Sequence, residues 1–283
     1  HCISSAASDV YKRQGGGHAS ARAVVVDFEP REGEYDATGL AIARSLDDAR
    51  TRRMLAEGLR GFVNPGEIVA LPAVLGIDNH SEVLADFKKI LGAEVFEIAS
   101  LPPCVPGMRL NNKLVATAKN ERVDYVLGSK VTGCTVADGK VVSVTVGTAG
   151  AGKEIKADAV VLAGGGFESG ALKLDSHGHL HETILDLPVT MPEGVKEEDL
   201  IHGDYWGSPQ PLFLCGVEVD ETMLVTYQGK PVHSNVYAAG GVIAGATRWQ
   251  EKSGEGIALG SAIKAADAIL SSVGAGAATK ERN

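Results

Sequence analysis

The stretch that decides the fold is AVVLAGGGFESG, residues 159–170. Apolar residues typical of a buried strand run directly into Gly164, Gly165 and Gly166. Glycine has no Cβ, so it permits positive φ angles and lets another group approach the peptide closely. The pattern therefore indicates either a tight turn or a strand end where a flat or phosphorylated ligand lies against bare backbone.

A second strand ends in the same way. In SNVYAAGG, residues 234–241, Gly240 and Gly241 follow an apolar run. If both strands lie parallel in one open sheet, their glycine ends meet at its carboxyl edge, where such sheets bind ligands. The alternative is a pair of ordinary turns, because the chain contains 35 glycines.

The last long helix adds a third part to this predicted site. SGEGIALGSAIKAADAILSSV, residues 253–273, begins with Ser253, Gly254 and Gly256. A helix N-terminus offers partial positive charge and free N–H groups. Reduced flavin develops negative charge at its N1–C2=O edge. The two glycine turns and this helix start therefore predict a common slot for an isoalloxazine, with FMN or FAD as the cofactor.

Composition excludes several classes of protein. The 283 residues carry a formal net charge of −9 and a pI of about 5.4, which argues against nucleic acid or an acidic membrane surface as the main partner. No run is long and apolar enough to span a bilayer. None of the four cysteines stands in a C-x-x-C pair, so we expect no metal site, iron–sulfur cluster or disulfide framework in this chain, and a cytoplasmic location.

Alternating strands and helices indicate an α/β architecture in the first part of the chain. Apolar runs at 22–30, 67–76 and 93–99 predict strands, and SEVLADFKKILG at 81–92 predicts a helix capped by Ser81. PPCVPG, residues 102–107, predicts a rigid turn, because proline disfavours helix.

Residues 123–148 change character and alternate with a period of two. Asp138 and Gly139 lie between two such runs and predict a hairpin turn. Antiparallel strands are therefore expected immediately before the strand that ends at Gly164.

Several stretches resemble a known family. ADAVVLAGGGFESGAL, and NVYAAGGVIAG with the helix after it, are similar to late motifs of the FAD-dependent oxidoreductases of the fumarate reductase type. Within these, LPPCVPGMRLNNKL, GGGFESGAL, GDYWGSPQPLFLCGVEVDET and NVYAAGGVIAG look like the B subunit of anaerobic glycerol-3-phosphate dehydrogenases. The resemblance spans about residues 67–272.

This resemblance implies a flavoprotein, carrying FMN or FAD, that oxidises sn-glycerol 3-phosphate to dihydroxyacetone phosphate. It also implies two partners: a catalytic flavin subunit, and an iron–sulfur, membrane-anchoring subunit that passes electrons to quinone. The chain would then lie at the inner face of the cytoplasmic membrane through these partners. Two alternatives stay open: a related flavin enzyme acting on another substrate, such as a fumarate- or ketosteroid-type reductase, and a non-catalytic scaffold that docks the flavin subunit.

The start of the chain departs from the family pattern. The family opens with a strand, a G-x-G-x-x-G turn and a helix, whereas residues 1–20 here resemble a translated adapter sequence. We therefore expect an N-terminally truncated fragment that is inactive alone. The predicted fold is a Rossmann-like FAD/NAD(P)-binding flavoprotein domain that lacks its first βαβ unit and carries an inserted β-rich cap.

The expected domain division follows from these patterns. It comprises a non-native or disordered leader at 1–20, an α/β section at 21–106, a flavin-binding domain at 107–170 and 231–273, a cap or substrate insertion at 171–230, and a disordered tail at 274–283.

Oxidation of a secondary alcohol needs a base for the hydroxyl proton and a cation for the phosphate. Arg109 is the candidate anion ligand, since guanidinium pairs bidentately with phosphate; an ion pair at a helix start is the alternative. Arg248 and Lys173 are weaker candidates for the same role. His202 is the candidate base, with a structural hydrogen-bonding role as its alternative.

Three histidines alternate at His177, His179 and His181, so on a strand they would share one face. Such a face can hold a metal ion or supply a base. A solvated loop is the favoured interpretation, because the sequence places no carboxylate or cysteine partner at ligand spacing.

Overall fold

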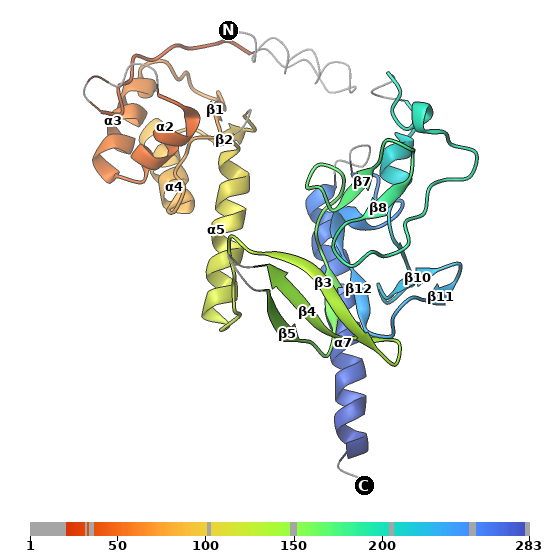
Figure 1. Cartoon of the computed structure of the whole chain (residues 1–283). Helices are drawn as coiled ribbons and strands as arrows, with labels where there is room; N and C mark the ends of the chain where they lie inside the picture. The colour runs from red at the N-terminus through yellow and green to blue at the C-terminus, as the bar shows by residue number, and fades with distance from the viewer. Residues whose placement is uncertain are drawn as a thin grey trace. The chain divides into compact units, whose positions relative to one another are not determined.

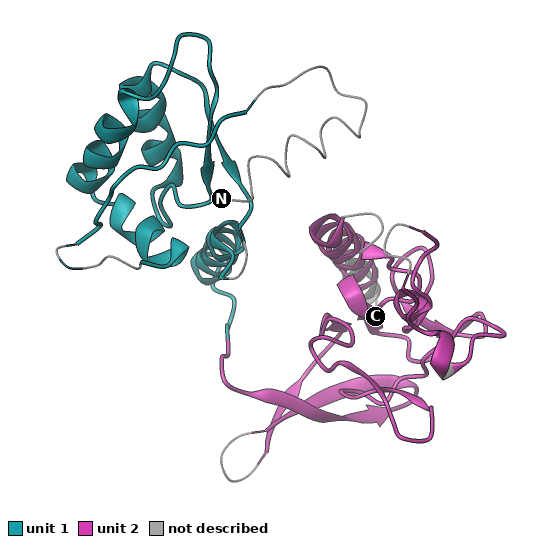
Figure 2. Cartoon of the chain, turned by 90° about the horizontal axis from the view of Figure 1, so that it is seen from above, with its two compact units in different colours: residues 1–125 teal, residues 126–283 magenta. Residues whose placement is uncertain are grey.

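The computed structural model divides the chain into two compact units. Unit 1 comprises residues 1–125 and unit 2 residues 126–283 (Figure 2). The division lies beyond the expected boundary at 106, because the helix α5 (Val105–Asn120) begins in the apolar core of unit 1 with Val105. The structure describes residues 21–31, 33, 37–100, 103–147, 152–203, 207–248 and 253–280, so the leader at 1–20 lies outside it.

Unit 1 contains a βαβ unit. β1 (Val69–Pro72) and β2 (Val95–Ile98) pair in parallel, and α4 (His80–Leu91) connects them (Figure 1). Parallel strands need such a crossover. The strands predicted at 67–76 and 93–99 are thereby confirmed. The unit's other helices before α5 are α2 (Gly39–Leu46) and α3 (Ala49–Arg60).

The ends of α4 follow from local chemistry. Gly92 ends the helix in the left-handed conformation at φ 65°, as the sequence predicts. The helix begins at His80 after Asn79, so Ser81 lies inside it and is not the N-cap. Val83, Phe87 and Leu91 occupy one face and are buried in the core of unit 1.

The rigid turn predicted at 102–107 is wrong in its second half. α5 begins at Val105, with Pro106 in its first turn, where the missing N–H of proline has no intrahelical partner to lose. Cys104 is the N-cap, and its Sγ accepts a hydrogen bond from the Gly107 amide at 3.4 Å.

The strand predicted at 22–30 is also wrong. The described residues 21–29 have no ladder partner and carry no regular structure. The segment is instead held through side chains: Val26 and Phe28 pack against the core of unit 1, and Arg22 Nε bonds Glu67 at 3.0 Å. A run of valines favours a strand only where a neighbouring strand can pair with it.

Unit 2 opens with an antiparallel sheet of β3 (Lys130–Ala137), β4 (Lys140–Gly147) and β5 (Lys153–Lys156), in that order. The hairpin predicted at Asp138 and Gly139 joins β3 to β4. Both residues have positive φ, 50° and 72°, which is the backbone of a type I′ turn.

The strands that end in glycine pair with each other. β6 (Val160–Leu162) and β12 (Val236–Ala238) are parallel. The segment between them forms two further antiparallel groups. The first group is β7 (Leu172–Leu174) with β8 (Leu180–Glu182), and the second is β9 (Glu218–Val219), β10 (Val225–Tyr227) and β11 (Lys230–Pro231). The segment also contains the short 3-10 helices η1 (Glu197–Asp199) and η2 (Pro211–Leu214), and a third, η3 (Gly240–Val242), follows β12.

The described residues of the inserted segment at 171–230 share an apolar core with β6 and β12. The segment's buried residues Leu172, Val217 and Val225 belong to the same apolar cluster as Leu162 of β6 and Val236 of β12. The segment is rich in short strands, as expected, and its buried apolar residues complete the core of unit 2.

Two buried polar residues hold this core together, and the sequence did not reveal either. Asn235 Oδ1 accepts the amide of Val141 at 2.9 Å, while its Nδ2 donates to the carbonyls of Val141 at 2.8 Å and Asp158 at 2.9 Å, which joins β4 to the start of β12. The carboxylate of Glu182 accepts backbone amides of the loop after β8, from Ile184 at 2.7 Å and Leu185 at 2.8 Å.

The final helix is α7 (Gly254–Lys280; Figure 1). It packs against η3. It was expected to stop near residue 273, and it continues as helix to Lys280. Ser261 and Ala265 are its buried residues within 253–272. Among the described helices, none is both long and apolar enough to cross a membrane.

Candidate functional site

The two glycine turns lie side by side at one edge of a parallel strand pair. Val160 stands opposite Val236 and Leu162 opposite Ala238, and the amide of Ala239 donates to the carbonyl of Leu162 at 2.9 Å. Both strands therefore end at the same carboxyl edge, which is the edge where open α/β sheets bind ligands.

The first turn needs its glycines for conformation and for space. Gly165 has φ 80°, which a residue with a Cβ rarely adopts. A Cβ on Gly164 would lie 2.7 Å from Ile184 Cδ1. The hydroxyl of Ser169 closes the turn by donating to the carbonyls of Gly164 at 2.6 Å and Gly166 at 3.0 Å.

The second turn is tied to α7. Gly240 has φ 75°, and its amide donates to Ser261 Oγ at 2.9 Å, while that hydroxyl donates to the Ile257 carbonyl at 2.6 Å. The turns approach each other backbone to backbone, since a Cβ on Gly166 would lie 3.0 Å from the carbonyl oxygen of Gly241. The two glycine turns are therefore in contact, as the sequence predicted.

Arg248 lies at this meeting point. A Cβ on Gly241 would overlap its guanidinium, one on Gly166 would lie 3.3 Å from its Nη2, and one on Gly254 would lie 3.8 Å from its Cβ. The three stretches that the sequence associated therefore converge on one side chain. The sequence predicted an open slot here, and the structure instead places the guanidinium against the bare peptide of Gly241.

Arg248 contacts two further side chains of unit 2. Its Nη2 forms an ion pair with Glu168 Oε1, and its Cζ lies 5.4 Å from the ring centroid of Phe213 in η2, which is cation–π geometry. Partial burial disfavours the ionised carboxyl of Glu168, but the hydrogen bond from Arg248 outweighs it and holds the pKa of Glu168 below its ordinary value. Glu168 follows the first glycine turn directly, so the pair links the two turns.

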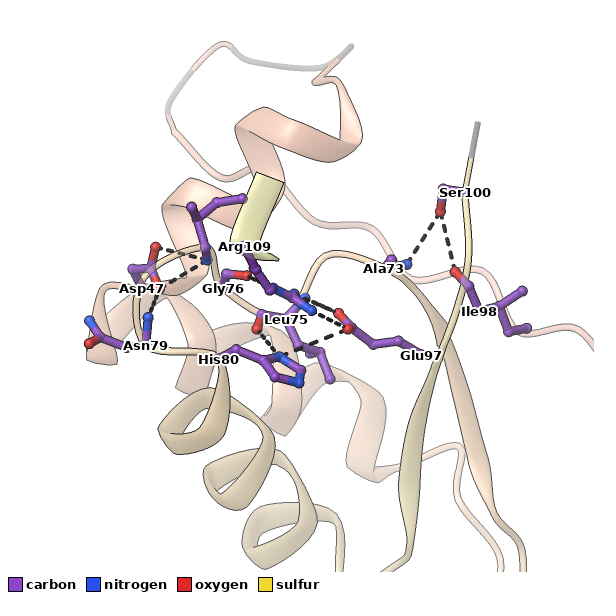
Figure 3. Close-up of polar contacts among 11 residues, drawn as sticks. Asp47, Ala73, Leu75, Gly76, Asn79, His80, Glu97, Ile98, Ser100 and Arg109 are labelled. Carbon is purple, nitrogen blue, oxygen red and sulfur yellow. Dashed lines mark hydrogen bonds and ion pairs between the residues drawn. The ribbon is translucent and has the colours of Figure 1, made fainter. Parts of the chain in front are cut away.

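Arg109 forms the ion pair that the sequence left as its alternative role. Its Nη1 and Nη2 bind Glu97 of β2 at 2.5 and 2.9 Å, and its Nε donates to the carbonyl of Gly76 at 2.7 Å (Figure 3). Glu97 also accepts the amide of Leu75 at 2.6 Å. Burial opposes ionisation of Glu97, yet these hydrogen bonds hold its pKa below the ordinary value. A phosphate would have to displace Glu97 to reach Arg109.

The loop after β1 is fixed by a second carboxylate. Asp47 accepts the backbone amides of Ile77, Asp78 and Asn79 at 3.0–3.2 Å. Figure 3 shows Asp47 beside Asn79, and the Nδ1 of His80 in contact with the Leu75 carbonyl at 2.8 Å. The sequence did not indicate a role for Asp47 or Glu97, because each binds a loop far from it in the chain. The separation is about 30 residues for Asp47 and about 20 for Glu97.

His202 is half-buried and closes a loop with Gln210. The amide of His202 donates to Gln210 Oε1 at 2.8 Å, and Gln210 Nε2 lies 3.3 Å from His202 Nδ1. Since the side-chain nitrogen of glutamine is a donor, this contact favours the ring tautomer with its hydrogen on Nε2. The base assignment for His202 stays a prediction, and Asp204, Tyr205 and Trp206 beside it lie outside the described residues.

The alternating histidines have a carboxylate partner, Asp175, that their spacing in the sequence did not indicate. Asp175 accepts the amides of His177 at 2.8 Å and His179 at 2.9 Å, and lies 3.0 Å from His181 Nε2. These contacts close the β7–β8 turn and hold the pKa of Asp175 well below its usual range. Within the part of the chain that the structure describes, no group of three or more histidine, cysteine or acidic side chains has the geometry to hold a metal ion.

A family model described as FAD binding domain matches residues 3–257. The chain belongs to this family. The match establishes an α/β flavoprotein fold with FAD as the cofactor. The residues where the two glycine turns meet fit that cofactor, because their peptides have no Cβ and a half-buried guanidinium beside them suits the electron-rich edge of a flavin. That these glycines hold the ring stays a prediction.

The chain is similar to curated proteins named as the B subunit of anaerobic glycerol-3-phosphate dehydrogenase. It is 28% identical over 242 residues to that of Yersinia pestis bv. Antiqua (strain Antiqua) and 28% identical over 246 residues to that of Pectobacterium atrosepticum, covering 85% of this chain in both cases. The chain spans 55% of the length of these curated relatives. Among solved structures, T. acidophilum thioredoxin reductase is 16% identical and covers 77% of this chain and 56% of its own, at a TM-score of 0.16 that is too low to inform the fold.

Proposed function

We propose that the protein is the flavin-binding B subunit of a glycerol-3-phosphate dehydrogenase, which oxidises sn-glycerol 3-phosphate to dihydroxyacetone phosphate. The names of the relatives support the substrate. The observation that carries the proposal is the parallel pairing of β6 with β12, which sets Gly164–Gly166 beside Gly240 and Gly241 at one edge.

When bound, FAD supplies the hydride acceptor. The residues of this chain would position it: Arg248 lies against the bare peptides of Gly166 and Gly241 and would face the flavin, and Ser261 fixes Gly240 against α7. The start of α7, from Ser253 through Gly256, supplies partial positive charge that stabilises negative charge on a ligand. His202 is the proposed base; it needs the opposite ring tautomer, or a rotated ring, to accept the hydroxyl proton.

The proposed partners are a catalytic flavin subunit and an iron–sulfur, membrane-anchoring subunit. Electrons from the reduced flavin would leave through the iron–sulfur partner to membrane quinone, and the protein would lie on the cytoplasmic side of the membrane through these contacts. The net charge of −9 supports attachment through protein partners, because an acidic chain is repelled by an anionic lipid surface.

The test is anaerobic reduction of the bound flavin. The product of the complete reading frame that encodes this chain is loaded with FAD or FMN and mixed with sn-glycerol 3-phosphate, with glycerol and succinate as controls. We expect the visible flavin absorbance to bleach with sn-glycerol 3-phosphate alone. A yellow protein that only another donor bleaches refutes the substrate, and a colourless protein that co-purifies with a separate flavoprotein supports the scaffold alternative instead.

A further inference from the structure

The guanidinium of Arg248 is held in place by surfaces that do not depend on its charged partner. Its side chain lies along the glycine turns and the start of α7, and Phe213 supports its face. Only 24% of the side chain is exposed. An arginine in such a position keeps its location when one hydrogen-bonding partner is exchanged for another.

Glu168 is the less anchored member of the pair. Its side chain is 62% exposed, and the ion pair joins one of its oxygens, Oε1, to one guanidinium nitrogen, Nη2. A guanidinium offers five N–H donors in a planar fork, so a single contact leaves much of that fork unused by the carboxylate. Exposed ion pairs contribute between zero and about 1 kcal/mol, so displacing Glu168 costs little.

We propose that Arg248 is the anion receptor of the site and that Glu168 is a built-in competitor, which a phosphate or carboxylate of the ligand displaces. A phosphate carries up to two negative charges and three acceptor oxygens, so it pairs with the fork better than one carboxylate oxygen does. The identification of that anion as the phosphate of sn-glycerol 3-phosphate rests on the proposed function; the receptor itself does not.

The arrangement also explains why Gly241 has no side chain. A Cβ there would overlap the guanidinium, whereas the neighbouring positions Val242 and Ala239 carry side chains that are buried. The bare peptide is thus needed for Arg248 to reach between the two turns. An anion bound to Arg248 would lie at the carboxyl edge of β6 and β12, beside the proposed flavin ring.

Isothermal titration of the 283-residue chain with inorganic phosphate, sn-glycerol 3-phosphate and glycerol tests the receptor. Glu168→Gln removes the competitor, so phosphate affinity is expected to rise about fivefold, the equivalent of about 1 kcal/mol. Arg248→Gln is expected to weaken it at least tenfold, and Arg248→Lys less, because lysine keeps the charge without the fork. Matched controls are Glu221→Gln and Lys230→Gln, exposed in unit 2, which should leave the affinity unchanged.

The proposal requires the two substitutions to change the phosphate affinity in opposite directions. If Glu168→Gln does not tighten binding, or if Arg248→Gln leaves phosphate affinity within twofold of the parent chain, the receptor assignment is overturned; so it is if glycerol binds as well as its phosphate. Circular dichroism confirms that each variant is folded, and the gain in Glu168→Gln cannot arise from misfolding.

Repeating the titration with FAD-loaded protein separates the two sources of the anion. Phosphate binding that persists assigns the receptor to the substrate, and binding that FAD abolishes assigns it to a phosphate of the cofactor. Failure of the proposed function looks different: flavin is not reduced by sn-glycerol 3-phosphate, while the two variants still shift phosphate affinity in opposite directions.

Discussion

Each unit has an arginine–glutamate pair at the carboxyl end of a parallel strand pair, but the two pairs are held very differently. Arg109 and Glu97 are 14% and 12% exposed and meet through two nitrogen–oxygen contacts, with further bonds to the loop after β1. Arg248 meets Glu168 through one contact, and Glu168 is 62% exposed. The same two residue types therefore form a fixed ion pair in unit 1 and a pair in unit 2 whose carboxylate a ligand can replace. The lower exposure of Glu97 makes the difference.

The largest expected effect is the loss of the less exposed pair, Arg109 with Glu97. Glu97→Ala leaves the charge of Arg109 without its partner and the Leu75 amide without its acceptor. We therefore expect the free energy of unfolding of unit 1 to fall by about 3 kcal/mol. Glu168→Ala should lower that of unit 2 by less than about 1 kcal/mol. Hydrogen exchange of peptides from each unit, followed across a urea series, measures both. Equal losses would remove the distinction between the two pairs.

The glycines beside each pair should differ in the same direction. Gly76 has φ 78°, and a Cβ there would lie 2.7 Å from Asp47 Oδ1 and 2.9 Å from Val83 Cγ2, so Gly76→Ala should cost about 2 kcal/mol in unit 1. A Cβ at Gly241 would overlap the guanidinium at the end of a single side chain, Arg248, and would force it away from the two turns. Gly241→Ala should therefore cost less than about 1 kcal/mol while abolishing the tight phosphate binding of the Glu168→Gln background.

The control for this comparison is Gly92→Ala. Gly92 has φ 65° but nothing within 4 Å of its Cβ position, so its substitution isolates the conformational cost from the steric one. If Gly92→Ala costs as much as Gly76→Ala by thermal unfolding, crowding by Asp47 contributes nothing and the loop after β1 is less rigid than its contacts indicate.

Local signals predicted the backbone that presents the site. The glycine ends of β6 and β12, the stop at Gly92 and the hairpin at Asp138 each depend on residues next to one another in the chain. The approach of the two glycine turns also followed from the sequence, because parallel strands share a carboxyl edge.

The side-chain partners were beyond the reach of the sequence. Glu168 and Arg248 are 80 residues apart, and Asn235 and Val141 are 94 apart, so no periodicity or spacing joins them. Arg109 is an example of this limit. Its position near a helix start was predicted, but its partner Glu97 lies on a separate strand. Only the fold brings that carboxylate to both guanidinium nitrogens. Strand formation at 22–30 failed for a related reason, since local β propensity does not supply a pairing strand.

The smallest expected effect is a change in folding stability at acid pH. The pKa of Glu97 and the pKa of Glu168 are both held low by an arginine, so each carboxyl favours the folded state when it is ionised. Since the unfolded pKa is about 4.3, that contribution is complete above about pH 5 and disappears as the pH falls through the lower folded-state pKa. Stability should therefore rise as the pH increases from the acid side towards about 5. Subtracting the profile of each Glu→Gln variant from the parent isolates the two carboxyls from Asp175, whose pKa is also lowered.

Because Glu97 is 12% exposed and Glu168 is 62% exposed, Glu97→Gln should flatten the pH profile of unit 1 more than Glu168→Gln flattens that of unit 2. Salt at roughly 0.5 M should erase mainly the second effect, because it screens exposed charges. Urea midpoints at a series of pH values provide the measurement. A steeper change for Glu168→Gln would mean that the exposed carboxylate is bound to Arg248 more firmly than a displaceable competitor should be, and it would weaken the anion-receptor assignment together with the contrast between the two edges.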